Sequence, residues 1–281
     1  MRTIERFFLL GLVFVLLSCE RVLVPLDKQG ASLGQGDGGS ESVLLRMGVC
    51  WPGVPLAKEL VAAYVAENPR VSTDIVACDT SAAHDLLSAG QVDLAVVSEA
   101  GGCRKDKRST SMALALDAVV VVVSRQSSLD EITREELSAL FGGYYVDWQR
   151  LSAGRGQPEL VVCQSGATAR ELFQAVIMEG QTVSSAAMVM PHDRAVLEYV
   201  AEHVNAVGYI SRAYVDERVK VLAIDGVLPT QEAIREGEYP LVHCLRVEIS
   251  ESAPREASDL LSFMCGREGQ HLVAERYVIP D

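Results

Sequence analysis

The fold is decided by the stretch VLLRMGVCWPGVPLAKELVAAYVAENPRVSTDIVACDTSAAHDLLSAGQVDLAVV, residues 43–97. Its apolar runs and their spacing predict strands at Val43–Val49, Val71–Cys78 and Val92–Val97, with helices at Pro55–Glu67 and Ala82–Ala89. A proline at a helix start presets φ and removes no hydrogen bond, and Asn68-Pro69 ends that helix. Strands that alternate with helices over short connections are typical of a mainly parallel sheet covered by helices.

The same alternation continues to the end of the chain. Further strands are predicted at Ala118–Val123, Leu160–Cys163, Ala206–Ile210, Val219–Ile224 and Val242–Ile249. Further helices are predicted at Thr133–Phe141, Thr168–Met178, Val196–His203, Thr230–Glu236, Ala253–Cys265 and Glu268–Arg276. Thr133 with Glu136, and Thr168 with Glu171, have the spacing of capping boxes, which mark helix starts. The chain is therefore expected to be α/β throughout.

The N-terminus indicates export. Two arginines precede the apolar run Phe7–Leu17, which is about half the roughly 20 residues that a membrane-spanning helix needs, so residues 1–18 read as a secretory signal. Leu16-Leu17-Ser18-Cys19 resembles a bacterial lipobox, which implies a lipidated (palmitate-bearing) Cys19; an ordinary signal peptide with a chance cysteine is the alternative. Residues 19–42, rich in glycine and serine, are expected to form a flexible tether. These features predict a membrane-anchored protein of the cell envelope that faces the periplasm or the exterior.

Charge and cysteine content restrict the possible partners. The formal net charge of −13 argues against nucleic acid but does not exclude a small anion, because local amide dipoles can outweigh distant surface charge. An even number of cysteines besides Cys19 permits disulfides, yet Cys50, Cys78 and Cys163 end apolar strands and favour the interpretation of unpaired, buried thiols. The histidines are scattered and no CxxC pair occurs, so neither a metal site nor a cofactor is expected.

Several fragments together resemble a known family. They are Ile132–Gly143 leading to Asp147-Trp148, Ala206–Ser211, Leu222–Val227 leading to Pro229-Thr230, Glu238–Leu241, and Glu268–Gln270. In this order they resemble the phosphate-binding subunit of bacterial phosphate ABC transporters, a type 2 periplasmic binding protein, from Val43 to Pro280. The resemblance implies a non-enzymatic, monomeric α/β protein of two lobes, 43–123 with 226–281 and 124–225, which captures a small anion for an ABC permease. The chain would cross between the lobes near Val123–Ser124 and Ile224–Asp225.

The resemblance also implies a ligand site. Its expected members are Thr80, Ser81, Asp93, Ser165, Gly166, Thr168 and Arg170. Helix starts suit an oxyanion because their first amides lack partners and the helix dipole favours negative charge. Ser165–Thr168 resembles the family's Ser-Gly-Thr loop with one alanine inserted, and Thr80-Ser81 resembles its second hydroxyl-bearing loop. Plain helix capping would explain both.

Asp93 matches the family's aspartate that accepts a proton from monohydrogen phosphate and so excludes sulfate; a strand-entry aspartate is the alternative. Three departures bear on the ligand: Cys50–Val54 has no hydroxyl, Leu160–Gln164 has no arginine, and Ser98-Glu99 stands where the family has Ser-Arg. Arg170 would replace the missing charge, whose loss costs about 1.5–3 kcal/mol, unless it is only a solvated helix residue. A sensor or surface-interaction module that kept the fold is therefore a second hypothesis. A hydrolase with Ser165 as nucleophile is a third, against which stands the lack of a Gly-x-Ser-x-Gly elbow.

Overall fold

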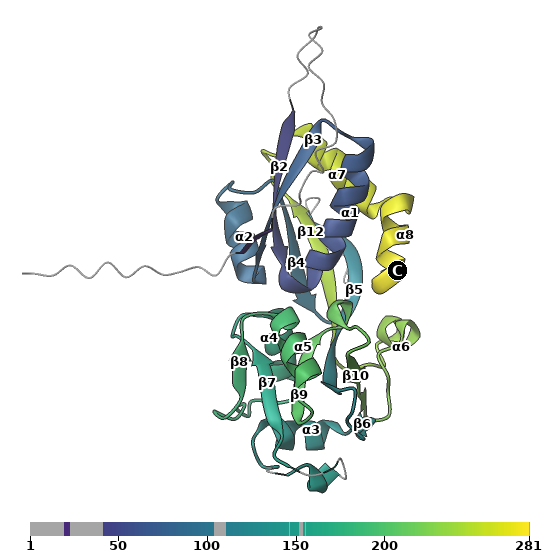
Figure 1. Ribbon diagram of the computed structural model, residues 1–281. Helices are drawn as coiled ribbons and strands as arrows, with labels where there is room; N and C mark the ends of the chain where they lie inside the picture. The colour runs from purple at the N-terminus through teal and green to yellow at the C-terminus, as the bar shows by residue number, and fades with distance from the viewer. Residues whose placement is uncertain are drawn as a thin grey trace, which may run out of the picture.

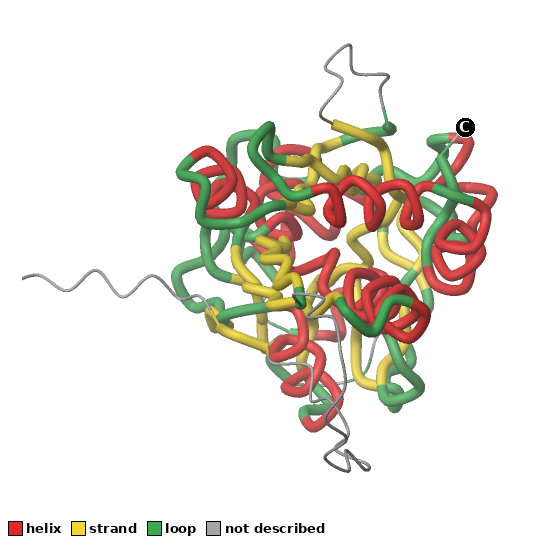
Figure 2. Tube along the Cα trace, turned by 90° about the horizontal axis from the view of Figure 1, so that it is seen from above, coloured by secondary structure: helices red, strands yellow, loops and turns green. Residues whose placement is uncertain are grey.

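The structure, a computed structural model, describes residues 20–22, 42–103, 111–145, 147–151, 154 and 156–280. Two α/β lobes lie one above the other (Figure 1), as predicted. Viewed along the long axis, the strands lie towards the middle and most helices lie around them (Figure 2). The predicted signal segment, Cys19 and most of the predicted tether lie outside the described residues.

The first lobe contains a sheet in the order β1-β3-β2-β4-β12-β5. Its strands are β1 (Glu20–Val22), β2 (Val43–Cys50), β3 (Val71–Cys78), β4 (Leu94–Ala100), β12 (Val242–Ile249) and the first part of β5 (Ser111–Ser124). Strand β2 is parallel to β3 and β4, whereas β12 is antiparallel to β4 and β5. One face is covered by the short 3-10 helix η1 (Trp51–Gly53) with α1 (Val54–Glu67), α7 (Arg255–Cys265) and α8 (Arg267–Arg276), and the other by α2 (Thr80–Ser88).

The second lobe extends the same sheet through β5. Its strands are β9 (Ala206–Ser211), β7 (Glu159–Cys163), β8 (Met188–Met190) and β10 (Val219–Val221), with β6 (Glu131–Ile132) and β11 (Ala223–Ile224) as a separate pair. Its helices are α3 (Arg134–Phe141), α4 (Thr168–Val176), α5 (Asp193–Glu202) and α6 (Gln231–Glu236), with 3-10 turns η2 (Trp148–Leu151) and η3 (Arg212–Tyr214). Two successive residues of β9, which point to opposite faces of the sheet, show which helix covers each face. Tyr209 stacks on Phe173 of α4, with 3.9 Å between the two ring centroids, whereas Gly208 faces Val196 of α5.

Strand β5 connects the lobes. Its residues up to Ala118 pair with β12, and Val119–Val123 pair with β9. The first crossing therefore lies near Asp117–Val119, earlier than the expected Val123–Ser124, because one buried valine-rich strand serves both sheets. The return also differs from the expected Ile224–Asp225: Ile234 and Tyr239 are buried in the second core, and the chain re-enters the first lobe after Leu241.

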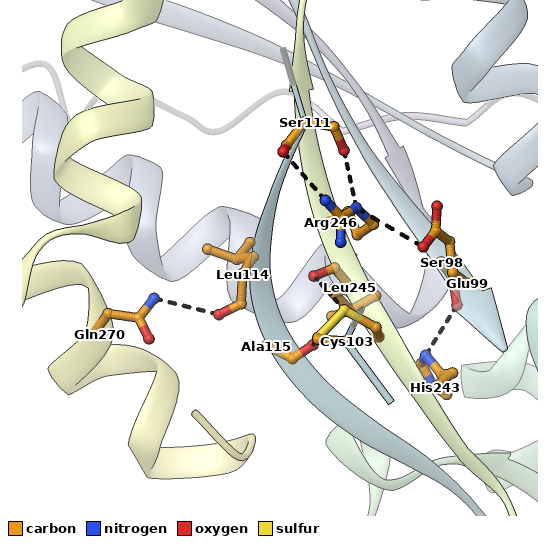
Figure 3. The surroundings of a disulfide bond; sticks show 11 residues. Ser98, Glu99, Cys103, Ser111, Leu114, Ala115, His243, Leu245, Arg246 and Gln270 are labelled. Atoms are coloured by element: carbon orange, nitrogen blue, oxygen red, sulfur yellow. Dashed lines mark hydrogen bonds and ion pairs between the residues drawn. A yellow bond between two sulfur atoms is a disulfide. The ribbon is translucent and has the colours of Figure 1, made fainter. Parts of the chain in front are cut away.

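A disulfide joins Cys103, just after β4, to Cys244 on β12 (Figure 3). The sequence permitted a disulfide but left its pairing open. Strand β12 returns between β4 and β5, so it places Cys244 beside a residue that is 141 positions away in the chain, with 4.9 Å between the two Cα atoms. Cys50 and Cys163 are free and buried, as expected. Of the two predicted capping boxes, the one joining Thr133 and Glu136 is confirmed.

Candidate ligand site between the lobes

Two helix starts lie close together between the lobes. Helix α2 follows β3 in the first lobe, and α4 follows β7 in the second, so both begin at carboxyl ends of parallel strands, where α/β sheets bind ligands. A Cβ placed on Gly166 would lie 3.4 Å from Oδ2 of Asp79, the residue before α2. The structure therefore places Asp79, just before Thr80 and Ser81, beside the Ser165–Thr168 loop. We call this region the α2/α4 mouth.

On the first lobe, the hydroxyl of Thr80 is engaged with the sheet. Thr80 is the first residue of α2, and its Oγ1 accepts a hydrogen bond from the backbone N of Ser98 at 3.2 Å. Asp79 is the N-cap residue, but its side chain makes no capping hydrogen bond, and Ser81 is exposed. Thr80 therefore ties α2 to the end of β4 and keeps one hydroxyl hydrogen to donate, while Ser81 is exposed to solvent.

Asp93 lies elsewhere. Its Oδ2 accepts a hydrogen bond from the backbone N of Arg46 at 2.8 Å, at the start of β4. Because Leu94 pairs with Met47 and β2 ends at Cys50, Asp93 is about 13 Å from the crevice edge along the strand. The structure does not bring Asp93 to the other predicted residues, and its position supports the strand-entry alternative. At the crevice end of β4 lie Ser98 and Glu99 instead.

On the second lobe, the Ser165–Thr168 loop is closed by a carboxylate of its own helix. Gly166 has φ of 90°, a left-handed value that suits glycine, and its N–H donates to Oε1 of Glu171 at 2.9 Å. The N-cap of α4 is Ala167, without a side-chain cap, so the predicted capping box between Thr168 and Glu171 is wrong. Ala167, the extra alanine of the loop, takes the N-cap position in place of Thr168. The carboxylate of Glu171 reaches the amide of Gly166, the residue before this N-cap.

Arg170 points its charge into the second lobe. One of its terminal guanidinium nitrogens, Nη1, is buried and has no hydrogen-bond partner. The guanidinium lies close enough to Tyr209 and Cys163 to counteract the rise in their pKa values that burial causes. Arg170 therefore places a positive charge beneath the loop, at the end of β7.

Carboxylates surround this mouth. Partial burial, reinforced by the nearby charge of Glu171, raises the pKa of Asp79 above its ordinary value, and Oδ1 of Asp79 is buried without a hydrogen-bond partner. Glu99 lies at the end of β4, with Arg246 Nε 3.9 Å from one of its oxygens. Asp79 and Glu171 make the α2/α4 mouth more acidic than the resemblance implies.

The loop before α1 packs the lobes together. Trp51 is 8% exposed, and its ring lies 4.7 Å from that of His192, which caps α5 in the other lobe. The Tyr214 hydroxyl donates to the Trp51 carbonyl at 2.6 Å, and the Tyr277 hydroxyl donates to the Pro52 carbonyl at 2.9 Å. Burial raises the pKa of the Cys50 thiol to about 12. This loop therefore packs one lobe against the other. That packing role explains why the loop has no hydroxyl side chains.

A buried polar network that sequence reasoning missed crosses the hinge. The hydroxyl Oγ of Ser98 lies 3.0 Å from Nδ1 of His243, whose Nε2 lies 3.3 Å from Oδ2 of Asp117. Asp117 also accepts a hydrogen bond from the Ser211 hydroxyl at 2.5 Å, and the Ser211 N–H donates to Oδ1 of Asp193 at 2.7 Å. His243, Asp117, Ser211 and Asp193 are at most 1% exposed. An aspartate inside the apolar run of β5 was the available signal.

The fold and this crevice define the class. A family profile described as PBP superfamily domain matches residues 52–268, and the chain belongs to this superfamily of binding proteins. The predicted two-lobed α/β fold is thereby confirmed. No group of three or more metal-ligating side chains occurs in the part of the chain that the structure describes.

Particular relatives are phosphate-binding proteins. The chain is 32% identical over 93 residues to "Phosphate-binding protein PstS 2" of Streptococcus pneumoniae, a match that covers 33% of this chain and 32% of the relative. It is 23% identical over 191 residues to "Phosphate-binding protein PstS" of Bacillus subtilis, which covers 66% of this chain and 63% of the relative. The chain thus spans less than two thirds of the length of each.

Among solved structures, a putative phosphate ABC transporter substrate-binding protein with bound phosphate from Clostridium perfringens superposes with a TM-score of 0.76. The match covers 85% of this chain and 100% of that chain at 20% identity. At this identity the likeness shows the fold alone.

Proposed function

We propose that this protein is an exported, lipid-anchored solute-binding protein of an ABC importer. It captures phosphate or a related small oxyanion between its lobes and presents the closed form to a permease. The observation that carries the proposal is the α2/α4 mouth, where Gly166 of one lobe lies against Asp79 of the other. Thr80, Ser81, Ser165 and Thr168 supply hydroxyls there, and the starts of two helices supply amides and the positive ends of their dipoles.

Capture would proceed by hinge closure. The two lobes are joined through β5 and the chain entering β12, so they can separate about these two crossings and close over a solute. The charge of Arg170 lies beneath the α4 loop, where it would attract an oxyanion in place of the arginine missing from β7. An oxyanion would take the Gly166 amide from Glu171, because one carboxylate in water is a weaker partner than a multiply charged ligand.

The disulfide and the N-terminal sequence support the proposed compartment outside the cytoplasm. Disulfides persist in oxidising, extracytoplasmic compartments. The disulfide between Cys103 and Cys244 therefore supports export of the chain. No helix in the described ranges is long and apolar enough to cross a membrane. Lipidation at Cys19 is the proposed anchor, and we propose a monomer as the working form.

A second candidate is a sensor or surface-interaction module that retained the fold. The observation that favours it is the hydrogen bond between the Gly166 amide and Glu171, together with the packed loop Trp51–Gly53. An internal carboxylate at the amide and a loop already engaged in lobe contacts leave fewer donors for an anion.

Titration calorimetry of the full-length chain with phosphate, sulfate, molybdate and arsenate tests the proposal. Micromolar or tighter binding of phosphate, weakened at least tenfold in Thr80→Val/Thr168→Val, is the expected result. The absence of heat with every oxyanion would overturn oxyanion transport and favour the second candidate. Asp93→Asn serves as the control, because its position predicts unchanged affinity.

A further inference from the structure

An interlobe cavity lies on the face of the sheets opposite the α2/α4 mouth. It has a volume of about 370 Å³ and is bounded by the first turns of α1 and the end of α8 from the first lobe. From the second lobe it is bounded by α5 and by the segment after η3. Helices α1 and α2 cover opposite faces of the first sheet, and α5 and α4 cover opposite faces of the second. We call this region the α1/α5 cavity.

The α1/α5 cavity is basic although the chain is acidic. The basic side chains that line it are Lys58 and Arg276 from the first lobe and Arg194 and Arg218 from the second; the carboxylates that line it are Glu59 and Asp216. The lining carries four cations and two carboxylates, and Glu198, which lies outside the lining, pairs with Arg194 at 3.1 Å. The cations thus outnumber these three carboxylates by one, in a chain whose formal net charge is −13. A small region of opposite sign on such a surface attracts anions locally.

The ion pairs within the cavity are exposed and exchangeable. Arg276 Nε lies 3.2 Å from Glu59 Oε1, and Arg218 Nη2 lies 2.8 Å from Asp216 Oδ2, with all four side chains about a third or more exposed. Exposed pairs of this kind contribute little to stability, so a ligand with more negative charge can replace the carboxylate. Lys58 makes no hydrogen bond or ion pair within the described residues.

Arg194 and Arg218, the cations of the second lobe, both act on groups that line the α1/α5 cavity. The hydrogen bond from Arg218 lowers the pKa of Asp216, and the charge of Arg194 contributes to the same lowering. Arg194 also opposes the rise in the pKa of the Tyr214 hydroxyl, which burial causes, and Tyr214 lines the cavity. Charges from two elements of one lobe therefore converge on the side that faces Lys58.

We propose that the α1/α5 cavity binds a small anion with at least two negative charges, of the phosphate, phosphate monoester or pyrophosphate type, held by Lys58 and Arg276 of one lobe and Arg194 and Arg218 of the other. Guanidinium groups bind such oxygens in pairs, and a multivalent anion can satisfy cations of both lobes at once. A bound anion would thus link the lobes and favour the closed arrangement. This site uses none of the residues of the α2/α4 mouth, so it goes beyond the proposed function.

The test is calorimetry of the full-length chain at low salt with phosphate, pyrophosphate and, as a monovalent comparison, chloride. We expect pyrophosphate to bind more tightly than phosphate, no saturable heat with chloride, and at least tenfold weaker pyrophosphate binding in Lys58→Gln/Arg218→Gln. Arg235→Gln/Arg255→Gln is the matched control, because it removes two exposed positive charges on α6 and α7 and should change the affinity less than twofold. Circular dichroism melts check folding, and Arg194→Gln/Arg276→Gln replaces the first variant if that one is unstable.

Each other result overturns the proposal in a distinguishable way. Equal weakening in the matched control would mean that only overall charge matters. Weakening confined to Thr80→Val/Thr168→Val would assign the anion to the α2/α4 mouth and leave the proposed function intact. No heat with wild-type protein would overturn both sites. Binding to vesicles with phosphatidylglycerol, but not to soluble anions, would replace the soluble ligand by a lipid headgroup.

Discussion

The α2/α4 mouth and the α1/α5 cavity, which lie on opposite sides of the boundary between the lobes, differ in charge. They also differ in that only the mouth is marked by a sequence motif. The α2/α4 mouth has the helix starts and hydroxyls that the family resemblance implies, yet Asp79 and Glu171 make it acidic. The α1/α5 cavity has no such motif, yet Lys58 and Arg218 make it basic. A motif therefore locates backbone amides but does not determine the net charge around them, because that charge comes from residues distant in the chain.

The largest expected effect concerns the network between the two sides. Asp117→Ala removes the carboxylate that joins His243 and Ser211 and leaves both polar groups buried without it. Each buried polar group left without a hydrogen-bond partner costs about 1–3 kcal/mol, so the free energy of unfolding should fall by about 3 kcal/mol. Urea unfolding followed by circular dichroism measures it.

Asp130→Ala is the control for that change. Its exposed pair with Lys220 predicts a loss below about 1 kcal/mol. Equal losses in the two variants would show that the network across the hinge does not stabilise the fold, and the two sides of the crevice would then be independent.

A smaller effect is expected at the loop of the α2/α4 mouth. Gly166→Ala imposes a side chain at φ of 90° and brings its Cβ to 3.4 Å from Asp79 Oδ2. The left-handed backbone alone costs about 1–2 kcal/mol. Gly180→Ala has the same φ of 90° but no atom within 4 Å of the Cβ, so it isolates this backbone cost.

Thermal unfolding compares the two alanine variants. We expect Gly166→Ala to lose as much stability as Gly180→Ala and to weaken phosphate binding in addition, because the new methyl group would narrow the space beside Asp79. If phosphate affinity were unchanged in Gly166→Ala, the loop would not be part of the ligand site.

These residues show what the sequence could and could not provide. Alternating apolar runs predicted the helices and strands, because burial on a sheet face imposes that period locally. The positions of the crossings were missed, because β5 is continuously buried from Leu114 to Ser124 and its apolar pattern does not change where its pairing passes from β12 to β9. Asp93 was assigned to the ligand from a short motif, although one strand register places it about 13 Å from the crevice edge. The partners of Cys103 and Asp117 lie in distant segments, as do the arginines that line a cavity with Lys58, and only the folded chain brings them together.

Asp193 allows a test, by pH, of the buried polar network that lies between the α2/α4 mouth and the α1/α5 cavity. We call this network the buried floor. Burial raises the pKa of its carboxyl above the ordinary value, so the folded state holds this proton more tightly than the unfolded state does. Stability from this group is therefore greatest at low pH and is lost as the pH rises from the ordinary carboxyl range through the raised folded pKa. Asp193→Asn keeps an oxygen that can accept from the Ser211 N–H and abolishes the titration.

Unfolding free energies of wild type and Asp193→Asn between pH 4 and pH 8 measure this effect. We expect the difference to move in favour of the asparagine variant as the pH rises. A difference independent of pH would mean that Asp193 is ionised throughout this range in both states, and the buried floor would then carry a full negative charge beneath both sides.

The smallest expected effect separates charge from motif at the α2/α4 mouth. Glu171→Gln retains an oxygen for the Gly166 amide but removes one negative charge from the loop. Because Glu171 is exposed, the gain for an incoming anion should be at most about 1 kcal/mol, which is a factor of about five in phosphate affinity. Glu179→Gln, an exposed carboxylate beyond α4, is the control and should leave the affinity unchanged. Unchanged affinity in Glu171→Gln as well would mean that the carboxylate already leaves the amide at no cost when the anion binds, and the contrast between the two sides of the crevice would then depend on the cations of the α1/α5 cavity alone.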